Sequence, residues 1–145
     1  HARPDSAEAT ENRRRLMALA VHDFPAVIAA LMPKLLAPSR MGDATLTGTI
    51  GSMALAVGKE AFSRQQEAII SRVDSRPDLK DIRCPAAVIA GRDDQLMPVE
   101  ILQELADGIA GAHLTIIEDC GHMAALEQPA RVLAALVEWL ERKTT

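Results

Sequence analysis

The sequence is poor in aromatic residues and cysteine, and it has no tyrosine at all. Phe24, Phe62 and Trp139 are the only aromatic residues among 145, so a core has to be built mainly from Leu, Ile, Val, Ala and Met. No apolar run approaches the roughly 20 residues that span a bilayer. The formal net charge of −4 also lacks the basic excess that nucleic acid and anionic lipid favour. We therefore expect a globular chain with neither a nucleic-acid nor a membrane partner.

Residues 1–73 have the apolar spacing of helices and contain no strand pattern. The first ten residues are interpreted as a loop, and Pro33 is expected to kink or end the second helix early. Four helices are predicted, beginning near Glu11, after the caps Asp23 and Asp43, and after a break at Gly58. Residues 1–73 are therefore predicted to form a helical region.

Residues 74–145 change to the order strand, helix, strand, helix after a linker at residues 74–77. Residues 86–90 and 113–117 are short apolar runs without alternation, which is typical of strands buried on both faces. The last helix is expected to open at Pro129 and to turn its apolar residues inward, namely Val132, Leu133, Leu136, Val137 and Leu140. The strand-helix-strand order predicts a parallel pair.

Two parallel strands do not make a self-sufficient sheet, because parallel sheets usually have several strands and two covered faces. The first strand is therefore expected to have a bare, apolar edge that could template another strand. This half of the chain has the pattern of the end of a larger sheet.

Acidic and basic groups follow both predicted strands. Asp93 and Asp94 lie in the loop after the first strand, and His122 lies in the loop after the second. Because the carboxyl ends of parallel strands meet at one edge, a carboxylate there can orient the imidazole of a general base. The alternative interpretation is that Asp93 or Asp94 caps a helix and that His122 is an ordinary surface histidine.

These two loops resemble those of the α/β-hydrolases. In that family a glycine is followed at the third position by the catalytic acid and at the seventh by proline, and GRDDQLMP at residues 91–98 has this spacing. IIEDCGH at residues 116–122, followed by EQP at 127–129, is similar to the last strand, histidine loop and final helix. The resemblance implies that Asp94 is the catalytic acid and His122 the base. It covers residues 74–143 closely, and residues 1–73 loosely as the helical cap of such enzymes.

The sequence departs from this family at the nucleophile. The family's serine lies on a strand-to-helix turn of pattern G-x-S-x-G, and no such turn occurs here. Ser52 follows Gly51 but lies inside a helical pattern, where a small residue of the cap is the simpler interpretation. Asp94 and His122 therefore resemble two members of a triad whose nucleophile is missing from this chain.

Cys120 is an alternative nucleophile by residue type, but a cysteine two residues from His122 on one loop is poorly placed for deprotonation by it. A disulfide with Cys84 is not expected, because the two residues flank opposite ends of the strands. Free thiols suit a reducing cytoplasm, the predicted compartment. The four histidines have no metal-ligand spacing with cysteine or carboxylates, so neither a metal nor a cofactor is predicted.

The fold predicted is therefore α/β: a helical cap at 1–73, followed at 74–145 by the C-terminal strand-helix-strand-helix part of an α/β-hydrolase core. The resemblance implies a serine hydrolase of a small ester or lactone, with perhydrolase chemistry as a variant of the same site. Leu96, Met97 and Met123 are candidates for a partly hydrophobic substrate pocket, although each could be plain packing.

The chain alone is expected to be inactive and to be a fragment. Its expected partners are the missing N-terminal half of the enzyme or a second copy of itself, giving a homo-oligomer. The alternative is a non-catalytic fragment or module that pairs through its open sheet edge.

Overall fold

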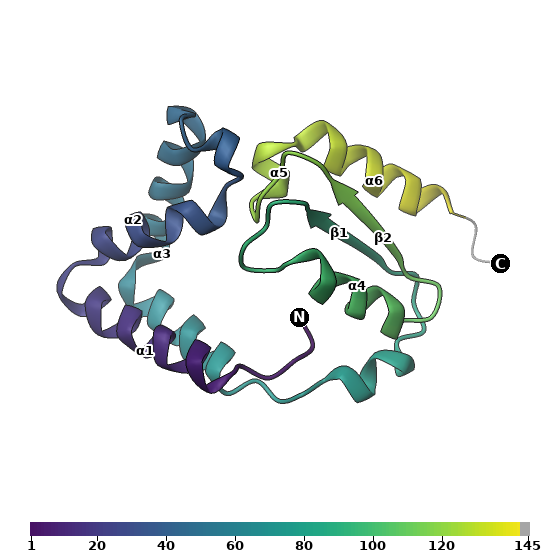
Figure 1. Cartoon of the computed structure of the whole chain (residues 1–145), viewed down its shortest axis with the longest axis horizontal. Helices are drawn as coiled ribbons and strands as arrows, with labels where there is room; N and C mark the ends of the chain where they lie inside the picture. The colour runs from purple at the N-terminus through teal and green to yellow at the C-terminus, as the bar shows by residue number, and fades with distance from the viewer. Residues whose placement is uncertain (143–145) are drawn as a thin grey trace.

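The computed structural model describes residues 1–142, which form a helical part and an α/β part (Figure 1). Within the described residues, the helical part consists of α1 (Ala7–His22), α2 (Phe24–Leu35), the 3-10 helix η1 (Pro38–Arg40) and α3 (Ala44–Ile70). A second 3-10 helix, η2 (Arg76–Asp81), lies on the connection to the α/β part. That part runs β1 (Ala87–Gly91), α4 (Val99–Gly108), β2 (His113–Ile117), α5 (Ala124–Glu127) and α6 (Pro129–Glu141). Residues 143–145 of the predicted second region lie outside the described residues.

Two helix boundaries differ from the prediction. Helix α1 begins at Ala7 rather than near Glu11, because the hydroxyl of Ser6 accepts a hydrogen bond from the Ala9 N–H at 3.0 Å and caps the helix. Helix α2 continues past Pro33 to Leu35, so Pro33 does not end it.

Helix α3 begins and divides where the sequence indicates. The Asp43 carboxylate accepts from the N–H groups of Thr45 and Leu46 at 2.9 and 3.1 Å and caps the helix. At Gly58 the backbone adopts φ 78° and ψ 161°, a conformation open to glycine, which separates two helical stretches. The predicted break at Gly58 is confirmed.

The helical part has its own core of Ala20, Val27 and Phe62. Phe24 packs against Phe62 with a ring-centroid distance of 5.5 Å and an interplanar angle of 52°. Two of the three aromatic residues of the sequence therefore meet in one cluster, where a tilted ring pair stabilises the contact of α2 with α3.

Strands β1 and β2 pair in parallel, with a register that runs from Ala87 opposite His113 to Gly91 opposite Ile117. Helix α4 lies on one side of the pair and α6 on the other, and both contact both strands (Figure 1). The predicted parallel pair with flanking helices is confirmed. Within residues 1–142 the sheet has two strands, so β1 is paired along one edge only.

The prediction for the inner face of α6 is wrong for most of its residues. Ala135 is buried, whereas the exposed fractions of four predicted inward residues are 62% for Leu133, 40% for Leu136, 42% for Val137 and 72% for Leu140. Two strands are too narrow to cover the whole apolar face of a helix, so only a thin stripe of α6 contacts them. The connection after β2 contains a short helix, α5.

Backbone segments approach one another closely where the two parts meet. A Cβ on Gly91, the last residue of β1, would lie 2.2 Å from the carbonyl oxygen of Gly121 and 2.4 Å from that of Cys120. A Cβ on Gly121 would lie 2.6 Å from the nitrogen of Ala37 and 2.6 Å from the carbonyl carbon of Leu36. The end of β1, the loop after β2 and the chain leaving α2 are therefore stacked, with glycine at each contact.

In the described part of the chain no helix is long and apolar enough to cross a membrane.

This stacking predicts opposite effects for two glycine substitutions. Gly91→Ala should lower the free energy of unfolding by about 3 kcal/mol, because backbone atoms cannot yield to the added methyl group. Gly48→Ala, on an exposed helical position with no atom within 4 Å of the new Cβ, should raise it by about 0.5–1 kcal/mol. Urea unfolding of both variants measures the difference, and equal effects would contradict the stacked-backbone interpretation.

Candidate active site

Asp94 and His122 lie together at the carboxyl edge of the strand pair. Asp94 is on the turn after β1 and His122 is on the loop after β2. The Nδ1 atom of His122 lies 2.9 Å from Oδ2 of Asp94, across 28 residues of sequence. Main-chain bonds hold the two loops in place, since the N–H of Arg92 donates to Ile117 at 2.9 Å and that of Asp93 donates to Cys120 at 2.8 Å.

The Asp94 carboxylate is buried and uses both oxygens. Its Oδ1 accepts from the N–H groups of Leu96 and Met97 at 2.8 and 2.9 Å, and its Oδ2 faces His122. Asp94 does not cap α4, whose N-cap is Pro98 without a side-chain hydrogen bond. The carboxylate therefore orients the imidazole instead of serving the helix.

Asp94 and His122 shift each other's pKa. Burial raises the pKa of Asp94, but the hydrogen bonds from His122, Met97 and Leu96 outweigh it, so its pKa lies below the ordinary value. The hydrogen bond to Asp94 raises the pKa of His122 above its ordinary value, against the opposing effect of burial. Each group therefore favours the charged form of the other.

The remaining imidazole nitrogen, Nε2, is not turned toward Asp94. Because Nδ1 faces the carboxylate, Nε2 is left to exchange a proton with another group, and the His122 side chain keeps 36% of its surface exposed. The main chain at this point is held by Leu35 at the end of α2, whose carbonyl accepts from the N–H groups of His122 and Met123 at 3.0 and 3.1 Å.

The three predicted pocket residues flank this pair in the chain. Leu96 is 39% exposed, and Met97 and Met123 are half-buried. A cavity of about 480 Å³ lies elsewhere, between β2 and α6, and is lined by other residues such as Thr115, Arg131 and Glu138.

Ser52 lies in a helix, and Cys120 is buried. Ser52 lies inside α3, and neither strand is followed directly by a serine. Cys84 and Cys120 are free, and Cys84 is exposed. Burial, with Glu127 and Asp94 adding to it, raises the pKa of the Cys120 thiol to about 11, which keeps it protonated near neutral pH. No group of three or more metal-binding side chains occurs among residues 1–142.

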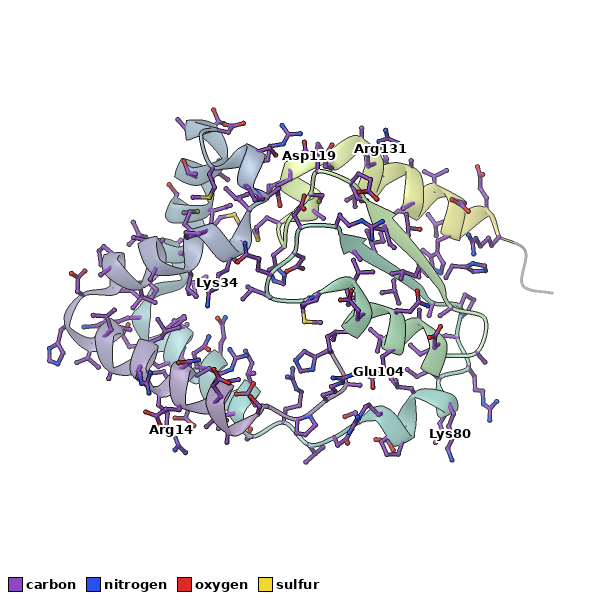
Figure 2. All side chains as sticks on the ribbon, in the orientation of Figure 1. Arg14, Lys34, Lys80, Glu104, Asp119 and Arg131 are labelled. Carbon is purple, nitrogen blue, oxygen red and sulfur yellow. The ribbon has the colours of Figure 1, made fainter. Side chains whose placement is uncertain are left out.

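A buried glutamate next to the pair was not foreseen as a functional residue. Glu127 is 5% exposed, and its carboxylate accepts hydrogen bonds from the N–H groups of Gly121, Met123 and Ala37. In the sequence Glu127 belongs to the segment EQP before the last helix, and no local pattern reveals that α2 ends beside it. Figure 2 shows the neighbouring Asp119 where the chain passes from β2 toward α5.

Similarity to known proteins agrees with this geometry. The thermophilic esterase from Thermogutta terrifontis is 32% identical and superposes with a TM-score of 0.88, over 97% of this chain and 52% of the esterase. The enol-lactonase from Burkholderia xenovorans LB400 is 26% identical with a TM-score of 0.85, over 97% of this chain and 53% of the lactonase. A monoacylglycerol lipase of Bos taurus is 31% identical over 70 residues, which are 48% of this chain and 21% of the lipase.

The chain thus spans about half the length of these two solved structures and about a fifth of the lipase. A family model matches residues 3–135, nearly the whole chain. With two parallel strands, flanking helices and this match, the chain belongs to the alpha/beta hydrolase family.

Proposed function

We propose that Asp94 and His122 are the acid and the base of a Ser-Asp-His triad that hydrolyses a small carboxylic ester or lactone. The observation that carries this proposal is the 2.9 Å hydrogen bond between His122 Nδ1 and the buried Asp94 carboxylate. It fixes the ring orientation in which Nε2 is free to accept a proton. The serine comes from outside residues 1–145, because no serine here has the strand-to-helix turn that exposes such a nucleophile.

In the proposed reaction His122 moves one proton twice. Nε2 takes the hydroxyl proton as the serine oxygen bonds to the acyl carbon, and it then returns that proton to the leaving alcohol as the ester bond breaks. Water repeats the sequence on the acyl-enzyme and releases the acid. Asp94 stays ionised throughout and stabilises the imidazolium that forms between these steps.

The substrate class is proposed from the relatives and from the residues beside the pair. The two solved relatives are named as an esterase and an enol-lactonase. Leu96, Met97 and Met123 are apolar and lie next to Asp94 and His122 in the chain, so they would give a substrate partly hydrophobic surroundings. Residues 1–73 would form the cap over that substrate and residues 74–145 the C-terminal part of the core.

The exposed free thiol of Cys84 suits the cytoplasm as compartment.

The two pKa directions define when the pair stabilises the fold. A lowered Asp94 pKa contributes stability above its ordinary value of 3.8, and this is lost as pH falls through the folded pKa. A raised His122 pKa contributes stability below its ordinary value of 6.5, and this is lost as pH rises through the folded pKa. Both contributions are complete only between these two values. Catalysis needs the neutral imidazole, so it belongs above the folded pKa of His122.

We therefore expect an NMR titration of His122 in this chain to give a pKa above 6.5. Asp94→Asn should bring the pKa down to 6.5 or below, because the charged acceptor is lost and burial remains. Asp93→Asn is the matched control, since Asp93 makes no hydrogen bond to the ring, and it should leave the titration nearly unchanged. A His122 pKa that is indifferent to Asp94→Asn would refute the proposed pair.

The missing nucleophile predicts the behaviour of this chain with serine reagents. Incubated with an aryl ester and a fluorophosphonate probe, residues 1–145 should neither release product nor take the label. In a longer protein that contains this chain and supplies the serine, His122→Ala should lower kcat by about 10⁴-fold or more. Stoichiometric labelling of residues 1–145 would identify a nucleophile here and overturn this part of the proposal.

A second candidate function is a module that pairs through its open sheet edge. The observation that favours it is the unpaired edge of β1 within residues 1–142, beside the exposed leucines of α6. Sedimentation of the chain should then give a dimer or larger species whose proportion rises with concentration. A monomer at all concentrations would eliminate the pairing module and leave the hydrolase proposal standing.

A further inference from the structure

We propose that Glu127 is a positioning residue that clamps the His122 loop to the end of α2 and thereby sets the orientation of the His122 ring toward Asp94. The catalytic meaning of this clamp rests on the proposed function, but the clamp itself is a property of this chain. It consists of the Glu127 carboxylate and the Leu35 carbonyl. Each accepts hydrogen bonds that attach the His122 loop to the end of α2.

The carboxylate half of the clamp collects three main-chain donors. Oε2 of Glu127 accepts from the Ala37 N–H at 2.8 Å, just after α2. The Gly121 N–H lies 3.0 and 3.1 Å from the two carboxylate oxygens, and the Met123 N–H lies 3.2 Å from Oε1. The two residues that flank His122 are therefore attached to the same side chain as the segment leaving α2.

The carbonyl half runs in the other direction. Leu35, the last residue of α2, accepts from the N–H groups of His122 and Met123 at 3.0 and 3.1 Å. The loop thus donates to the helix end at Leu35, and the helix end donates to the loop's own Glu127 through Ala37. Because the bonds close a ring of contacts, neither segment can shift without breaking several of them.

Burial makes the clamp costly to break. Glu127 is 5% exposed, Ala37 and Cys120 have no exposed surface, and Gly121 is also buried. Hydrogen bonds from N–H groups to a carboxylate are stronger than those to a neutral acceptor, and an unpaired N–H at this depth has no access to water. Gly121 adds a steric reason, since its missing Cβ lets the Leu36 and Ala37 backbone approach.

No other acidic side chain of the loop has this position. Glu118 is exposed and pairs with Arg92 at 2.7 Å, and Asp119 accepts from the Ser39 hydroxyl on the surface. Asp119 also lies 3.7 Å from Arg40. The two contacts of Asp119 join the loop after β2 to η1, but they do not involve the residues that flank His122. Glu127 is therefore the side chain that connects the helical part to the base.

The clamp predicts that His122 and the end of α2 respond together when Glu127 changes. Glu127→Gln keeps the size of the side chain but replaces one acceptor oxygen by an NH₂ group that faces N–H donors. Glu127→Asp keeps the charge and shortens the side chain by one methylene, so it cannot reach all three donors. Glu118→Gln removes a neighbouring carboxylate that is outside the clamp and serves as the matched control.

The test is NMR on residues 1–145, which needs no activity. In the unchanged chain we expect a low-field Nδ1–H signal of His122, the mark of its hydrogen bond to Asp94, and slow exchange of the amides of Ala37, Gly121 and Met123. Glu127→Gln and Glu127→Asp should abolish the low-field signal and speed exchange of these three amides about 10- to 100-fold. Glu118→Gln should change neither, and the amides of β1 and β2 should stay protected in all variants.

Several outcomes would overturn the proposal. A low-field signal that persists in Glu127→Asp and Glu127→Gln would mean that the ring is oriented without the clamp. Loss of the signal in Glu127→Gln but not in Glu127→Asp would mean that the negative charge of Glu127, and not its reach to all three N–H donors, orients the ring.

If both variants unfold, hydrogen exchange in the unchanged chain decides the question. The clamp requires that the amides of Ala37, Gly121 and Met123 open together, and independent opening of Ala37 would refute it. Failure of the proposed triad gives a different result, namely a His122 titration that is unaffected by Asp94→Asn while the clamp amides remain protected.

Discussion

The close contact of three backbone segments is the constraint on which the rest of this structure depends. The end of β1 meets the loop after β2 at Gly91, and that loop meets the chain leaving α2 at Gly121, with no room for a side chain at either contact. Main-chain groups that approach this closely must satisfy one another or be satisfied by a buried side chain. The carbonyl of Leu35 and the carboxylate of Glu127 do so for the residues around His122.

The hydrogen bond between Asp94 and His122 follows from this packing. Asp94 is positioned by the turn after β1, and its second oxygen is held by two main-chain N–H groups. His122 is positioned by a loop that is attached to α2. The helical part and the strand pair therefore each contribute to one hydrogen bond, and a change in the position of α2 would be transmitted to the imidazole. A proton acceptor whose orientation is fixed this way is suited to the proposed hydrolysis.

The exposed apolar face of α6 and the unpaired edge of β1 both result from the small width of the sheet. A pair of parallel strands covers only a stripe of each flanking helix, so the apolar face of α6 that the periodicity predicts as buried is largely exposed. An additional strand paired with β1 would cover its open edge.

Local sequence determined the elements and the two polar loops. Apolar runs of strand length, helical spacing, and caps at Asp23 and Asp43 predict most helices and both strands. The resemblance of residues 91–98 to the acid loop of the α/β-hydrolases implies Asp94 rather than Asp93 as the acid. Tertiary structure decided the rest. The start of α1 depends on the Ser6 hydroxyl, and the exposure of Leu133 and Leu140 depends on how wide the sheet is. The role of Glu127 depends on the N–H of Ala37, which follows α2 and is 90 residues away in sequence. A periodic pattern indicates which residues can be buried. Which segments cover them, and which distant N–H groups bind a given carboxylate, is decided only when the segments pack.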